Sequence, residues 1–139
     1  AESNQTERNA LLDLIFSTMR GKKVVIMSGD VHSVSMFRLE HAQYPETTLY
    51  QVTSSGIAQQ PVAEYLPWVP KALVDQMVGD DGKVGMVGHA AVSHTLLYRE
   101  VTAHNFAIVH VDEKQQVSVD IHCVPPHEGE TFVISQTLV

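Results

Sequence analysis

The sequence has little cysteine and little positive charge. Cys123 is the single cysteine, so an internal disulfide is excluded. Nine lysines and arginines stand against 16 aspartates and glutamates, which gives a formal net charge of −7 with the histidines neutral. Nucleic acids and anionic membranes both need a basic surface, so this charge argues against either as a partner.

Long apolar runs are also missing. No segment approaches the roughly 20 apolar residues that a membrane span needs, so we expect no membrane span. The 139 residues are 44% hydrophobic and 18% charged, a composition typical of a folded domain. We expect one domain over residues 1–139. The first residue is Ala1, and we expect the chain to be a processed product or a fragment.

An amphipathic helix is predicted over residues 7–20. Thr6 is a suitable N-cap, and Gly21 is suited to the left-handed residue that ends a helix, with Arg20 as a basic residue in the last turn. Apolar residues recur at spacings of three and four, as in a helix with one buried face. The predicted apolar stripe consists of Leu11, Leu14, Ile15, Thr18 and Met19.

The remaining elements are predicted to be strands. Residues 24–27 form a short apolar run that suits a strand covered on both faces. Strict alternation over residues 117–123 indicates a half-buried antiparallel strand. Further strands are predicted at residues 34–39, 47–53, 95–101 and 105–111. Residues 131–139 are expected to form a last strand or a docked tail. Residues 58–92 are irregular, with a short helix expected at 71–78. The pattern predicts an α/β fold of the mixed α+β kind. Its sheet should contain both parallel and antiparallel strands and end in an antiparallel C-terminal hairpin.

The sharpest candidate site is the pentapeptide Ser-Gly-Asp-Val-His at residues 28–32, directly after the apolar strand. Ligands of α/β sheets gather beyond the carboxyl ends of strands. Asp30 and His32 offer a carboxylate and an imidazole, which suit manganese, iron, magnesium or calcium. The alternative is a plain turn, in which Asp30 accepts backbone N–H bonds and His32 belongs to the core.

Two other segments are weaker candidates. Thr-Ser-Ser-Gly at residues 53–56 could present Ser54 and Ser55 to an anion or form a plain turn. His89, after Gly88, matches half of a Gly-His-x-His metal motif. Most of the eight histidines need no function. Neither the Gly-x-Ser-x-Gly elbow of serine hydrolases nor a Gly-rich phosphate loop is present.

Taken in order along the chain, three segments resemble the PhoD-like phosphatases, a branch of the calcineurin-like metallophosphoesterases. The segments are VVIMSGDVH at residues 24–32, YQVTSSGI at 50–57 and Asn105-Phe106, the last followed by Ala107 where the family has glycine. Residues 11–19 resemble the helix that precedes the site. The chain resembles the C-terminal half of such a domain.

This resemblance implies a two-sheet sandwich flanked by helices and a di-metal site that hydrolyses small phosphomonoesters or phosphodiesters. By analogy Asp30 is a metal ligand, His32 is a second ligand or a catalytic phosphate contact, and Ser54 and Ser55 line the pocket. The family takes most of its ligands from the N-terminal half. We therefore expect this chain to supply only part of the site, and to self-associate or to need the remainder of a parent chain. The alternative is a non-catalytic α/β interaction module that associates through exposed strand edges.

Overall fold

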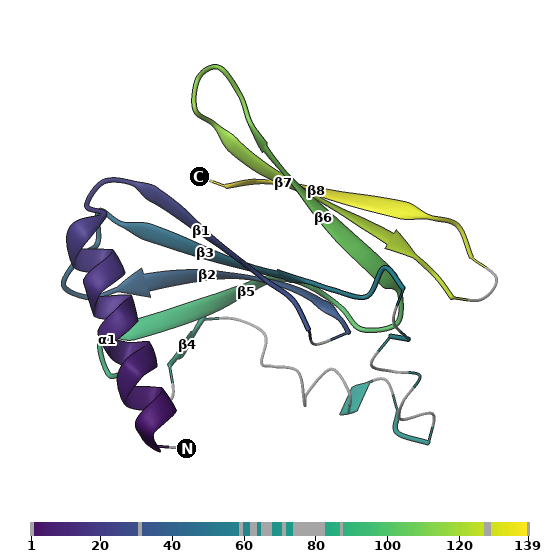
Figure 1. Cartoon of the computed structure of the whole chain (residues 1–139), viewed down its shortest axis with the longest axis horizontal. Helices are drawn as coiled ribbons and strands as arrows, with labels where there is room; N and C mark the ends of the chain where they lie inside the picture. Colours follow the sequence, from purple (N-terminus) through teal and green to yellow (C-terminus); the bar gives the residue numbers. More distant parts are fainter. Residues whose placement is uncertain are drawn as a thin grey trace.

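The computed structural model describes residues 2–30, 32–58, 60–61, 64, 68–70, 72–73, 83–86, 88–126 and 129–138. One helix and two sheets form three layers over this part of the chain (Figure 1). Helix α1 (Glu2–Thr18) packs against one face of the larger sheet, and the smaller sheet packs against its other face. The predicted mixture of helix, mixed sheet and antiparallel C-terminal hairpin is confirmed.

The larger sheet, called sheet A, has the strand order β1-β3-β2-β5-β4. Its strands are β1 (Lys23–Ser28), β2 (Val34–His41), β3 (Thr48–Ser54), β4 (Lys83–Gly85) and β5 (Val92–Glu100). β1 runs parallel to β3, with Ser28 opposite Thr53, and the other pairings are antiparallel. β1 and β3 therefore end at the same edge of the sheet.

The smaller sheet, called sheet B, is an antiparallel meander. Its strands are β6 (His104–Val111), β7 (Val117–Val124) and β8 (Phe132–Leu138). The alternation predicted for residues 117–123 is confirmed, because Val119, Ile121 and Cys123 are fully buried while the residues between them are not.

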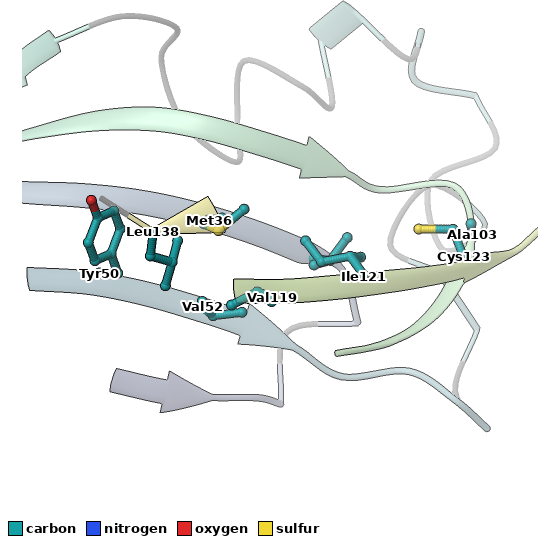
Figure 2. Close-up of a cluster of buried hydrophobic side chains, with 9 residues drawn as sticks. Met36, Tyr50, Val52, Ala103, Val119, Ile121, Cys123 and Leu138 are labelled. Atoms are coloured by element: carbon teal, nitrogen blue, oxygen red, sulfur yellow. The ribbon is translucent and has the colours of Figure 1, made fainter. Parts of the chain in front are cut away.

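Two hydrophobic clusters hold the layers together. Between the sheets, Met36, Tyr50 and Val52 of sheet A face side chains of sheet B, as Figure 2 shows. On the opposite face of sheet A, Leu12 and Phe16 of the helix pack against the sheet. Sheet A is therefore covered on both faces, but the cover expected for residues 24–27 is incomplete. Residues 24–26 are half-buried, and Met27 is 48% exposed, because β1 lies at the edge of the sheet.

Two details of the predicted helix are wrong. The helix begins at Glu2, so Thr6 lies inside it and is not the N-cap. The buried face carries Leu12 and Phe16, whereas Leu11 and Leu14 are 55% and 57% exposed. Two apolar stripes, offset by one residue, satisfy the same helical spacing, and packing of the bulky Phe16 ring against sheet A selects the second.

The end of the helix is largely as expected. Gly21 has a φ of 67°, the left-handed conformation predicted for it. Arg20 lies beyond the last helical residue, so it is not a basic residue of the last turn. Of the helix predicted at residues 71–78, Ala72 and Leu73 are helical, and the other residues lie outside the described part. No helix among the described residues has both the length and the apolar character needed to cross a bilayer.

Candidate functional site at the ends of β1 and β3

The candidate site lies where the parallel strands β1 and β3 end side by side. The hydroxyl oxygens of Ser28 and Thr53, the paired residues near these ends, are 2.8 Å apart and share a hydrogen bond. The loop at residues 29–33 and the corner at residues 54–57 therefore leave sheet A together. This is the edge at which an α/β sheet collects its ligands.

The loop after β1 has an unusual backbone. Asp30 and His32 have φ values of 73° and 52°, in the left-handed region that non-glycine residues rarely adopt. Each such residue costs on the order of 1–3 kcal/mol and persists only where its surroundings hold it. Among the described residues, the third non-glycine case is Gln115, in the turn between β6 and β7. The two residues that the sequence singled out are thus the two held in a strained loop.

Ser55 holds this loop from the neighbouring corner. The backbone N–H of His32 donates to the Oγ of Ser55 over 3.1 Å. A Cβ added to Gly29 would lie 3.3 Å from the Cβ of Ser55 and 3.5 Å from the carbonyl oxygen of Ser54, so glycine permits the close approach. The structure thus places Ser54 and Ser55 beside the loop that carries Asp30 and His32.

The ring of His32 is held in a defined tautomer. Its Nδ1 lies 3.2 Å from the carbonyl oxygen of Gln60, and because a carbonyl only accepts, Nδ1 carries the hydrogen. Nε2 is then the nitrogen with the lone pair, the form in which an imidazole binds a metal. His32 is partly exposed and Asp30 is exposed, so His32 is not a core residue. Among the described residues, Asp30 accepts no backbone hydrogen bond.

Sheet B also reaches this corner. The hydroxyl of Ser54 donates to the Oδ1 of Asn105 over 3.0 Å, and the Nδ2 of Asn105 donates to the carbonyl of Ala103 over 3.2 Å. His104 donates from Nδ1 to the carbonyl of Gly56 over 3.0 Å. The sequence assigned no role to Asn105 or His104. The one available signal was the Asn105-Phe106 segment of the resemblance.

A second cluster of polar side chains lies at the other end of sheet A. Asp13 of the helix, His41 at the end of β2, and His89 before β5 place one possible ligand atom each within 4.8 Å of one another. Both imidazole side chains are nearly buried, at 2% and 8% exposure. The Oδ1 of Asp13 is 3.0 Å from the Nε2 of His41 and 3.1 Å from the Nε2 of His89. The sequence indicated only His89, as a weak candidate for a metal ligand, and did not group these three residues.

The hydrogen bonds of His41 argue against a metal at this cluster. The backbone N–H of Gln43 donates to the Nδ1 of His41 over 3.1 Å, so Nδ1 holds the lone pair and Nε2 carries the hydrogen. A metal binds a deprotonated ring nitrogen, and here the Nε2–H instead donates to Asp13. The cluster is a hydrogen-bonded clamp that joins the helix, the end of β2 and residue 89.

Two cavities in the described part of the chain lie away from the loop that carries Asp30 and His32. One, of about 360 Å³, lies beside His41 and is lined by Glu40 and residues 90–93. The other, of about 280 Å³, lies between the helix and sheet A, with Arg8, Phe37 and His94 in its lining. These cavities are set apart from the strained loop.

The single thiol is structural. Cys123 is fully buried in the core between the sheets, and burial raises the pKa of its thiol. Its Sγ lies 3.9 Å from the hydroxyl of Tyr98. A buried thiol with a raised pKa is a poor nucleophile, so the chain offers no reactive cysteine.

Comparisons with protein-family models, with curated proteins and with solved structures find no match to this chain. The function is therefore inferred from the residues and geometry of the site itself.

Proposed function

We propose that this chain supplies part of the active site of a metal-dependent phosphoester hydrolase. Asp30 is a metal ligand, His32 is a second ligand or a catalytic contact to the phosphate, and Ser54 and Ser55 line the edge of the pocket. The observation that carries this proposal is the backbone of the loop: Asp30 and His32 both have positive φ, directly after the strand β1, which runs parallel to β3. Strain of this kind is typical of functional loops.

The donor atoms fit the proposed metals. A carboxylate oxygen and an imidazole nitrogen suit manganese or iron, and the carboxylate also suits calcium or magnesium. When bound, such ions polarise a phosphoryl oxygen and offset the charge that develops during hydrolysis. The chain's own contribution is to orient the donors: Gln60 holds the ring of His32, and Ser55 holds its backbone.

Within the part of the chain that the structure describes, the proposed site is incomplete. Asp30 and His32 give two ligands, whereas hard divalent ions in proteins take about six, some of them waters. We infer that further ligands come from the remainder of a parent chain or from a partner. The substrate is a small phosphomonoester or phosphodiester, and the chain alone should bind metal weakly and hydrolyse little.

Manganese alone provides the direct test, because the paramagnetic ion broadens the NMR signals of nearby nuclei. Titration of the ¹⁵N-labelled chain with Mn²⁺ should broaden the amides of Gly29, Asp30 and His32 first. Asp30→Asn keeps the shape of the side chain and removes its charge, so the selective broadening should disappear. His122→Gln is the control. His122 lies on the face of sheet B that points away from sheet A, so this change should leave the selective broadening of the loop unchanged. Equal broadening of the loop in wild type and Asp30→Asn would remove Asp30 as a ligand.

A second candidate is the non-catalytic interaction module. β1 pairs on one side only in the described part of the chain, and sheet B has two edge strands. Large apolar side chains are also exposed, with Ile57 at 72%, Trp68 at 76% and Val111 at 67%. Both candidates predict association, which sedimentation would measure. They differ in the Mn²⁺ titration, because an interaction module has no reason to bind Mn²⁺ at Asp30.

A further inference from the structure

We propose that Asn105 is a positioning residue for the candidate site, through which sheet B holds the loop that carries Asp30 and His32. This inference rests on the proposed function and adds a residue to it. Asn105 is the second residue of β6, far from the loop in sequence, and its side chain is 2% exposed. It acts through other residues, because the hydrogen bonds of its side chain go to Ser54 and Ala103.

The amide of Asn105 is fixed at both ends. Its Nδ2 donates to the carbonyl of Ala103 over 3.2 Å, which defines how the amide is turned. Its Oδ1 then faces β3 and accepts the hydroxyl hydrogen of Ser54 over 3.0 Å. A leucine of similar size could fill this space but could neither accept from Ser54 nor donate to Ala103. The buried position therefore calls for a side chain that both donates and accepts.

The corner held by Asn105 is the one that the loop touches. Ser55 follows Ser54 directly, accepts the backbone N–H of His32 over 3.1 Å, and lies against Gly29. A displacement of Ser54 would move Ser55, and with it the acceptor that secures the left-handed backbone at His32. The path therefore runs from sheet B through Asn105, Ser54 and Ser55 to His32.

Sheet B supports the same corner at a second point. His104, the residue before Asn105, donates to the carbonyl of Gly56 over 3.0 Å. The carbonyl of Gln60, four residues further on, accepts from the ring of His32. The start of β6 thus contacts the corner on both sides of Ser55. Partners that orient a ligand in this way are worth about 10- to 100-fold in metal affinity in other sites.

Two variants remove the same hydrogen bond from its two ends. Asn105→Ala removes the acceptor, and Ser54→Ala removes the donor without opening a large hole in the core. Thr47→Val is the matched control. Thr47 precedes β3, at the end of the strand opposite Ser54, and its buried hydroxyl donates to the backbone carbonyls of Phe16 and Met19. The control should be destabilised without any effect on the loop.

The experiment has two readouts. The first is hydrogen exchange of the His32 amide without metal, which should speed up in Asn105→Ala and in Ser54→Ala but not in Thr47→Val. The second is the apparent Mn²⁺ affinity from broadening of the Asp30 and His32 amides, which should fall about 10-fold in the first two variants only.

The outcomes separate the two proposals. Unchanged exchange at His32 in both variants would overturn the positioning role, whatever the metal data show. Faster exchange at His32, with no selective Mn²⁺ broadening of the loop even in wild type, would support the path from Asn105 to His32. The same result would contradict the proposed metal function. Faster exchange with unchanged Mn²⁺ affinity would show that Asn105 secures the loop backbone but does not position the ligands, and would overturn the inference.

Discussion

The backbone N–H of His32 donates to the Oγ of Ser55 over 3.1 Å, joining two segments that are 23 residues apart in the sequence. Both segments leave the same edge of sheet A, because the strands that precede them run parallel. The relationship explains why the two polar motifs belong to one site, and it makes Gly29, between the end of β1 and Asp30, sensitive to substitution.

Gly29→Ala should destabilise the chain by about 1–3 kcal/mol, the usual cost of overpacking. The added Cβ would lie 3.3 Å from the Cβ of Ser55, so one of the two segments must move. Ser55→Gly removes that neighbour, and with it the acceptor of the His32 N–H, so it is measured as a background: Gly29→Ala should cost less in the Ser55→Gly chain than in wild type. Urea unfolding measures both effects. Gly21→Ala is the comparison, since no atom lies within 4 Å there and its cost comes from positive φ alone. If Gly29→Ala costs the same in both chains, the clash with Ser55 is not the cause.

Asp13→Ala should cost about 1–3 kcal/mol of unfolding free energy, because two nearly buried imidazole N–H groups lose their shared acceptor. Asp13→Asn keeps an acceptor oxygen and should cost less. The control is Glu46→Ala, whose contact with Arg20 at 3.9 Å is exposed, and which should cost about 0–1 kcal/mol. Equal losses for Asp13→Ala and Glu46→Ala in urea unfolding would show that the clamp contributes little.

The same clamp should not bind a transition metal through His41. Long-range ¹H–¹⁵N NMR spectra should show the hydrogen of His41 on Nε2 and that of His32 on Nδ1, because Gln43 donates to the first ring and Gln60 accepts from the second. Any change that Zn²⁺ causes in the unfolding midpoint should therefore be the same in wild type and in His89→Gln. A stabilisation by Zn²⁺ that is lost in His89→Gln would identify the clamp as a metal site.

Asp120 should make stability depend on acid pH. Its pKa lies below the ordinary value of 3.8, mainly because Ser135 donates a hydrogen bond to it, with His110 also contributing. A lowered pKa in the folded state means that the ionised form is the stabilising one. Its contribution is present above about pH 3.8 and is lost as the pH falls through the lower folded value. The stability difference between wild type and Asp120→Asn in urea should therefore shrink from pH 5 to pH 3. A constant difference would contradict this assignment.

Local pattern was sufficient for most strands and for the candidate loop. The alternation over residues 117–123 reports how that strand is covered, because side chains of a strand alternate between its two faces. The apolar run at 24–27 predicted the strand itself but overstated its cover, since Met27 is exposed. Gly29, Asp30 and His32 lie within a few residues of the strand end, so their grouping also needed no long-range information. Their positive φ values could not be read from the residue types. Aspartate and histidine adopt the left-handed region more often than most non-glycine residues, but most of them still have negative φ.

Tertiary structure decided what depends on distant residues. The sequence by itself determined that a helix lies near the N-terminus and that strands follow it. It also determined that Asp30 and His32 come directly after the first of these strands. Only packing decided that Phe16, not Leu11 or Leu14, faces sheet A, because both stripes have helical spacing. Only packing joined Ser54 to Asn105 and Asp13 to His89, which are 51 and 76 residues apart. The physical reason is that periodicity records which face of an element is buried, whereas the partner of a buried polar group is set by how whole sheets and helices stack.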